Sequence, residues 1–215
     1  MKPKHMLLFA MTTVMLAGSG CQSVKYSALE KVGIHKREIL VDDVKKARDA
    51  QQEAKQQFEN ALEQFNSIVN FDGGELEKRY EKLKKVLARS ESKAQAVGSR
   101  INAVEDVGMA LFKEWNGELK QYTSKELRQS SEAQYDGSLE KYHSMIGAMR
   151  QAESKIEPVL KPLRDQVLFL KHNLNAQAIS ALKKELSSIE NNVAALIQEL
   201  EAAIAEADRF IAEMQ

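Results

Sequence analysis

The sequence contains few cysteine, proline and aromatic residues. One cysteine and three prolines occur in 215 residues, and Phe, Trp and Tyr together make up 6% of the chain. A single cysteine excludes a disulfide within the chain, and the scarcity of proline leaves long stretches free to be helical. Basic and acidic residues are equal in number, 31 of each. Because nucleic-acid binding needs a concentrated basic face, we expect no nucleic-acid partner. The many Ala, Glu, Lys, Leu and Gln residues favour long helices over a thick globular core.

Long apolar runs are also missing after residue 20, so no later segment is expected to cross a membrane. The apolar stretch Met6–Ala17 has twelve residues and follows the basic residues Lys2 and Lys4. A membrane-spanning helix needs about 20 apolar residues, whereas the apolar part of a signal peptide needs only about 7–15. We therefore predict that residues 1–20 are a signal peptide.

The only cysteine, Cys21, follows the small residues Gly18, Ser19 and Gly20. This order resembles the lipobox of bacterial lipoproteins, although Gly18 stands where leucine is commoner. A thiolate is a good nucleophile, so cysteine is the residue that takes a diacylglyceryl thioether. The resemblance implies cleavage before Cys21 and acylation of the new N-terminus, palmitate included, which gives a stable anchor. The alternative is an ordinary secretory signal with an incidental cysteine, but a lone thiol is unusual in an oxidising compartment.

The residue after the cysteine is Gln22, not the aspartate that resembles an inner-membrane retention signal. The expected location is therefore the outer membrane, on its periplasmic face, with the lipid on Cys21 as the anchor. Residues 21–35 are expected to form a lipidated tether. Within the tether, Ser27 and Glu30 match a capping box, which predicts a short helix or a flexible segment.

Residues 36–215 carry apolar residues at alternating spacings of four and three, which is the pattern of coiled-coil helices. Turn signals interrupt this pattern at three places, at "DGG", at "YTSKEL" and at "HNLN". The interruptions predict long helices over roughly 36–70, 75–121, 124–171 and 176–213. Such helices close into an elongated antiparallel bundle. The expected fold is all-α, with 36–215 as one domain of four long helices after the cleaved signal peptide.

The position of the last turn is open in the sequence. Pro158 and Pro162 lack the N–H that a helix interior needs, so the third helix kinks or breaks near them. If the chain reverses there, the last helix has over fifty residues and overhangs the third. If the chain instead reverses near Asn173, with Asn175 as N-cap, the four helices have closer lengths of about 50–70 Å. We favour the second arrangement.

The start of the third helix is marked by Thr123 and Glu126, which match a capping box. The apolar seam of this helix is polar at three successive positions, Ser131, Gln134 and Ser138. Polar residues at seam positions predict thin or exposed packing in this part of the bundle.

The second helix carries Trp115 on its apolar seam, where a core position is expected. The same helix contains Gly98, Gly108 and Gly117. Each glycine costs up to about 1 kcal/mol relative to alanine inside a helix. The glycines permit either the close approach of another helix or local bending, and the sequence does not choose between these.

Motifs for catalysis are missing: the chain has no phosphate-binding GxxxxGK[ST] loop and no GxSxG nucleophile motif. Glu140 and His143 have the Glu-x-x-His spacing of di-iron bundles, but no second such pair exists, so His143 is expected on the surface. His172 is expected to cap helix carbonyls or to belong to a partner surface. We therefore expect no enzyme, no metal site and no cofactor.

The segment Glu77–Lys85 is locally basic, with Lys and Arg interleaved with Glu around the helix. A solvated helix face is the favoured interpretation, and contact with phospholipid headgroups is the alternative.

Two segments, "AMRQAE" (Ala148–Glu153) and above all "DQVLFLKHNLNAQAI" (Asp165–Ile179), resemble an uncharacterised family of proteobacterial lipoproteins that is catalogued only as a domain of unknown function. The similarity extends over nearly the whole mature chain. It implies a lipoprotein and a gammaproteobacterial source, and it brings no activity, cofactor or catalytic residue with it.

The expected function is that of an outer-membrane-anchored periplasmic lipoprotein. Its coiled-coil body would act as a structural or protein-interaction module, with envelope proteins or a second copy as partners. The alternative is a periplasmic binding or chaperone-like module that holds an apolar ligand or client between its helices. The polar seam of the third helix and the adaptable side chains Met145 and Met149 motivate this alternative.

Overall fold

The computed structural model describes residues 35–70, 73 and 75–214. Five α-helices and one short 3₁₀ helix account for almost all of them. They are α2 (Lys36–Val69), α3 (Leu76–Glu118), η1 (Leu119–Gln121), α4 (Lys125–Ser154), α5 (Ile156–His172) and α6 (Ala176–Met214). All belong to one unit of the chain, Lys36–Gln215.

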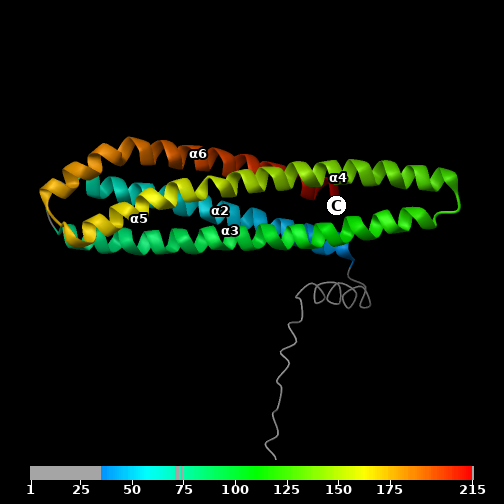
Figure 1. Ribbon diagram of the computed structural model, residues 1–215, viewed down its shortest axis with the longest axis horizontal. Helices are drawn as coiled ribbons and strands as arrows, with labels where there is room; N and C mark the ends of the chain where they lie inside the picture. The colour runs from blue at the N-terminus through cyan, green and yellow to red at the C-terminus, as the bar shows by residue number, and fades with distance from the viewer. Residues whose placement is uncertain (1–34, 71–72, 74, 215) are drawn as a thin grey trace, which may run out of the picture. The chain divides into compact units, whose positions relative to one another are not determined.

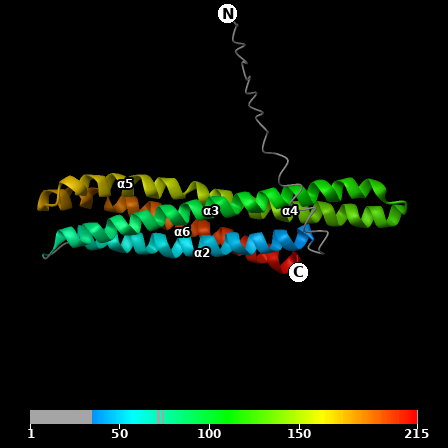
Figure 2. The ribbon, with the colours of Figure 1, turned by 90° about the horizontal axis from the view of Figure 1, so that it is seen from below.

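The helices form an elongated antiparallel bundle in which α4 and α5 together make one of four rods (Figures 1 and 2). The rod α2 packs against α3 on one side and α6 on the other, and the α4–α5 rod packs against the same two helices. Successive rods run in opposite directions, which is the up-down-up-down topology. The predicted all-α bundle of four long helices is confirmed.

The core is built from the apolar seams. Its large side chains with no more than 1% exposed surface include Phe58, Phe65, Leu40 and Ile68 of α2, Leu83 and Ile101 of α3, Met145 and Met149 of α4, Leu163 and Leu170 of α5, and Leu182 and Ile189 of α6. Burying a side chain of this size contributes about 1.5–3 kcal/mol. The helices are therefore held by one apolar core that runs along the described bundle.

The first turn lies where the double glycine predicts it, between α2 and α3. Gly73 has a φ of +129°, a conformation that side chains with a Cβ rarely adopt. The backbone at this residue reverses the chain and brings Leu76 into α3.

The start of α4 differs by one residue from the sequence expectation, because Ser124 rather than Thr123 is the N-cap. The Leu127 N–H donates to Ser124 Oγ at 3.2 Å. The Ser124 hydroxyl in turn donates to Glu126 Oε2 at 2.9 Å. This second bond orients the Ser124 hydroxyl, and the helix cap therefore forms at Ser124.

The predicted break near the prolines lies just before them. Pro158 has no N–H to donate to the carbonyl of Ser154, and α4 ends at that residue. The Lys155 N–H bonds back to the Ala152 carbonyl at 3.1 Å, and α5 begins one residue later.

Pro162 lies inside α5 and leaves the carbonyl of Pro158 without its helical donor. The side chain of Asn192 on α6 approaches this carbonyl, with Nδ2 at 3.4 Å from the oxygen. A side chain of the neighbouring helix thus replaces, through a long bond, the hydrogen bond that the proline removes.

The chain reverses between α5 and α6 near Asn173, not at the prolines. The Ala178 N–H donates to Asn175 Oδ1 at 3.0 Å, so the predicted cap at Asn175 is confirmed. At the end of α5, Asn173 Nδ2 donates to the Phe169 carbonyl at 2.9 Å, whereas His172 is exposed. The carbonyl cap expected of His172 is therefore made by Asn173.

One end of the bundle narrows from four helices to two. Lys36, the first residue of α2, bonds Glu114 of α3 at 3.0 Å, and Glu213 near the end of α6 bonds Lys141 of α4 at 2.8 Å. Residues 115–138 extend beyond these contacts, and we call them the α3–α4 projection (Figure 1). The polar seam positions of α4 lie in this projection: Ser131 faces Trp115 of α3, and Gln134 and Ser138 border a groove with Arg37 of α2 and Met214 of α6.

Candidate functional site

The predicted lipid attachment site, Cys21, lies outside the described residues, as do the signal peptide 1–20 and all of the tether except His35. The described chain enters the bundle at Lys36, which the ion pair with Glu114 holds in place. Within residues 35–70, 73 and 75–214, no helix is long and apolar enough to cross a membrane.

Clusters that suggest metal chemistry are not found in the part of the chain that the structure describes, where no three His, Cys, Asp or Glu side chains are placed to hold an ion. Glu140 and His143 are both exposed on α4. The expectation that His143 is a surface residue is confirmed.

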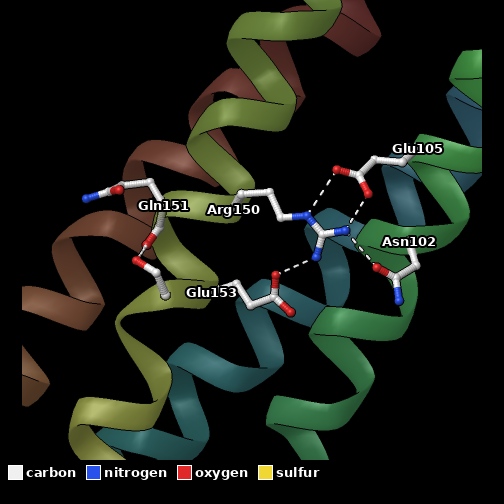
Figure 3. Close-up of polar contacts among 6 residues, drawn as sticks. Asn102, Glu105, Arg150, Gln151 and Glu153 are labelled. Carbon is white, nitrogen blue, oxygen red and sulfur yellow. Dashed lines mark hydrogen bonds and ion pairs between the residues drawn. The ribbon is translucent and has the colours of Figure 1, made fainter.

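The densest polar cluster surrounds Arg150 at the α3–α4 interface (Figure 3). Its Nε lies 3.0 Å from Glu105 Oε1, and one Nη2 bond reaches the second oxygen of the same carboxylate. The same Nη2 lies 2.7 Å from Asn102 Oδ1, and Nη1 lies 2.6 Å from Glu153 Oε2. Two residues of α3 and one of α4 thus hold a single guanidinium.

The electrostatics of this cluster favour a structural role. Hydrogen bonding to Glu105, and then to Glu153, raises the pKa of Arg150, while burial opposes the shift. The guanidinium is therefore permanently charged and transfers no proton. Bidentate pairing with Glu105 fixes the position of α4 along α3, because the two groups match only in one geometry.

We expect Arg150→Met to lower the free energy of unfolding by about 1–2 kcal/mol, because it removes charge-assisted bonds and leaves two neighbouring carboxylates without their cation. Urea denaturation followed by circular dichroism measures the change. Arg128→Met is the matched control, since Arg128 is an exposed residue paired with Glu132 within one helix. We expect it to cost less than about 0.5 kcal/mol. Equal losses in the two variants would contradict the structural role of Arg150.

Next to this cluster, Tyr142 lies buried against Gly108. A Cβ added to Gly108 would lie 2.5 Å from three atoms of the phenol, so only glycine permits this approach. Burial, reinforced by the carboxylates of Glu105 and Asp106, raises the pKa of Tyr142 to about 12. The phenol is therefore neutral at physiological pH and serves packing.

The other two glycines of α3 have different environments. A Cβ at Gly98 would lie 2.6 Å from Glu153 Oε1, at the far end of a side chain that Arg150 holds. A Cβ at Gly117 would meet nothing within 4 Å. Close helix approach thus accounts for Gly108, whereas at Gly98 a Cβ would displace only the end of the Glu153 side chain, and no packing reason exists for Gly117.

An aromatic cluster joins α3 and α4 at the base of the α3–α4 projection. Phe112 stacks on Trp115 with 6.5 Å between ring centroids, and Tyr135 meets both rings edge-on at 5.8 and 5.6 Å. Trp115 Nε1 donates to Ser131 Oγ at 2.9 Å. Trp115, expected in the core, is half-buried because it lies where the bundle narrows. The polar seam residue Ser131 serves as its hydrogen-bond partner.

Three polar residues of α2 are buried, Lys36, Gln51 and Gln64, and of these Gln51 has no exposed surface. Its side chain is fully buried, and neither amide atom has a hydrogen-bond partner. An unpaired buried amide costs about 1–3 kcal/mol. The nearby Gln57 is different, because its Nε2 donates to the Val86 carbonyl at 3.1 Å and to Ser90 Oγ at 3.2 Å.

We expect Gln51→Leu to raise the free energy of unfolding by about 1–2 kcal/mol, because leucine has a similar volume and no polar atoms to satisfy. Thermal or urea unfolding measures it. Gln57→Leu is the control and should destabilise the bundle, since it breaks two bonds. A lower stability of Gln51→Leu than of the parent chain would show that the amide makes bonds in solution.

The sequence interpretation missed the Arg150 cluster. Arg150 and Glu153 have the helical spacing of an ion pair, which is a detectable signal. The partner Glu105 lies 45 residues away, and nothing in the sequence sets the register that joins them.

Comparison with known proteins identifies a family and nothing further. The model of the family described as "Protein of unknown function (DUF2959)" matches residues 25–214. No curated protein and no solved structure matches the chain. The match covers the entire helical bundle and confirms the resemblance to a family catalogued only as a domain of unknown function. The chain belongs to the DUF2959 family.

Proposed function

We propose that this protein is a lipoprotein of the outer membrane, anchored on the periplasmic face through lipid on Cys21, and that its helical body is a structural or protein-interaction module. The observation that carries the proposal is the order of the chain. A lipobox-like segment ends at Cys21, and a helical body with its own apolar core begins at Lys36. We propose no catalytic role.

The body suits a role as a spacer or scaffold. Its longest helix, α3, has 43 residues, which corresponds to about 65 Å. The apolar core and the interhelical ion pairs hold the rods along their length, so the exposed faces keep fixed positions relative to one another. Fixed, widely spaced surface positions are what a protein that joins or separates envelope components requires.

One exposed apolar pair is a candidate contact for a partner. Leu168 and Phe169 lie on the outer side of α5, with 62% and 41% of their surfaces exposed. Both belong to the "DQVLFLKHNLNAQAI" segment. Large apolar side chains that are adjacent and exposed are frequent in protein interfaces.

The alternative of a ligand held between the helices has less support. Met145 and Met149, the adaptable residues that motivated it, have no exposed surface and belong to the filled core. A ligand at these residues would have to separate α4 from its neighbours.

In vivo photo-crosslinking tests the interaction role. We expect a crosslinking amino acid at position 168 or 169 to give a discrete adduct with an envelope protein or with a second copy of the chain. The matched control is the pair Ala194 and Ala195 on α6, which are also adjacent and exposed. Equal adducts at positions 168/169 and 194/195, or no adduct at either pair, would contradict an interface on α5. Recovery of the parent protein in the soluble periplasmic fraction would contradict the anchor.

A further inference from the structure

A row of cations lies along the outer face of α3 near its start. Lys78, Lys82, Lys85 and Arg89 are spaced by four, three and four residues, so they share one side of the helix, and all four are exposed. We call them the α3 basic row. The sequence predicted that the cations of Glu77–Lys85 are spread around this helix. The two cations of this segment that are not in the row, Arg79 and Lys84, have other partners. Arg79 bonds the Ser67 carbonyl, and Lys84 bonds Glu81.

The carboxylates near the row are largely occupied by other partners. Glu81 pairs with Lys84, and Glu91 pairs with Arg164 of α5 at 2.6 Å. Glu75 pairs with Lys78, at the end of the row. Glu77 lies on α3 within the same segment, and Glu63 on α2 borders the same groove as Lys82.

Three cations of the row have no counterion in the described chain. Lys82, Lys85 and Arg89 make no hydrogen bond or ion pair with any described residue. In contrast, many cations elsewhere on the bundle are paired across helices, as Lys55 is with Glu201 and Arg48 is with Asp208. The row is therefore a local excess of positive charge on a surface where pairing is common.

We propose that the α3 basic row is a second membrane contact, in which the bundle lies with this face on anionic phospholipid headgroups. The row extends for about 16 Å along a straight helix. A line of cations fits a flat sheet of phosphates, whereas a single phosphate is bound by cations that converge on one point. The proposal concerns a surface distinct from the lipid on Cys21 and does not depend on it.

The position of the row suits such a contact. The tether joins the bundle at Lys36, the first residue of α2. The row lies beside the opposite half of α2, where the Ser67 carbonyl accepts a hydrogen bond from Arg79. An anchor joined to one end of α2 and a basic surface beside its other end hold this helix along a membrane. A lipid anchor combined with a basic patch binds membranes more stably than either alone.

Vesicle co-sedimentation tests the proposal, using residues 21–215 with Cys21→Ser so that no lipid anchor contributes. The helical body has its own core, so this chain can fold without residues 1–20. We expect binding to phosphatidylglycerol–phosphatidylcholine vesicles, weak binding to pure phosphatidylcholine, and loss of binding in 1 M salt, where charges are screened beyond about 3 Å.

The triple variant Lys82→Gln, Lys85→Gln and Arg89→Gln should weaken binding to the anionic vesicles on the order of a hundredfold, since each cation near such a surface contributes about fivefold. The matched control replaces three other exposed lysines, Lys171, Lys183 and Lys184, by glutamine and should retain most of the binding. Unchanged circular dichroism shows that both variants are folded.

Three results would overturn the proposal. One is equal binding of the parent chain to neutral and anionic vesicles, and another is equal loss in the row variant and the control variant. The third is binding to a soluble polyanion such as heparin without binding to anionic vesicles, which would assign the row to a partner other than a membrane.

Discussion

Cells that produce the Cys21→Ser variant in labelled palmitate should show no label on this protein, whereas the parent chain should be labelled. The expected loss is complete, because serine lacks the thiolate that forms the thioether and the chain has no second cysteine. Immunoprecipitation followed by autoradiography measures it.

The control for this prediction is Ser23→Ala, which changes a residue two positions beyond the proposed attachment site and should keep the label. Circular dichroism of the purified Cys21→Ser protein should remain strongly helical, because the helices lie in the separate unit Lys36–Gln215. Equal labelling of Cys21→Ser and the parent chain would refute the anchor and leave the alternative of an ordinary secretory signal.

Gly108→Leu should destabilise the bundle by about 3 kcal/mol or more, at the upper end of the cost of overpacking. The new side chain would enter the space of Tyr142, which is 5% exposed and also contacts Phe112 of α3, with 5.2 Å between the ring centroids. The phenol is enclosed on most of its surface, so a shift would disturb its neighbours. The better helix propensity of leucine, about 1 kcal/mol over glycine, offsets only part of this cost. Urea unfolding gives the free-energy difference.

Gly117→Leu is the matched control, because this glycine belongs to the same helix and a Cβ there meets no atom within 4 Å. It should raise stability by up to about 1 kcal/mol, the opposite sign to Gly108→Leu. Adding Tyr142→Ala should reduce the cost of Gly108→Leu, since it removes the group that clashes. If Gly108→Leu and Gly117→Leu are equally stable, the helices do not approach at Gly108 as described.

Much of the fold could be predicted because the apolar pattern is local. Seam positions such as Leu40, Phe58 and Leu182 are fully buried, as the alternation of four and three requires. The turns at Gly73 and Asn175 were also predictable, since a positive φ and a side-chain cap depend on residues close in sequence.

The predictions that needed correction concern competition between neighbouring residues. Thr123 and Ser124 both have hydroxyls suited to an N-cap, and the bond from Ser124 to Glu126 decides between them. His172 and Asn173 both lie at the end of α5, and the amide of Asn173 reaches the carbonyl of Phe169. Such choices depend on side-chain geometry that the order of residues does not specify.

By itself, the sequence determined the helical class, the apolar face of each helix and the approximate places where the chain turns, because these follow from spacing within a few residues. Only the tertiary structure decided the axial register, which is the position of each helix along its neighbours. That register joins Arg150 to Glu105, brings Tyr142 onto Gly108 and leaves residues 115–138 as a two-helix projection. A seam that repeats every seven residues fits its neighbour at several offsets, so packing across all four rods must select one.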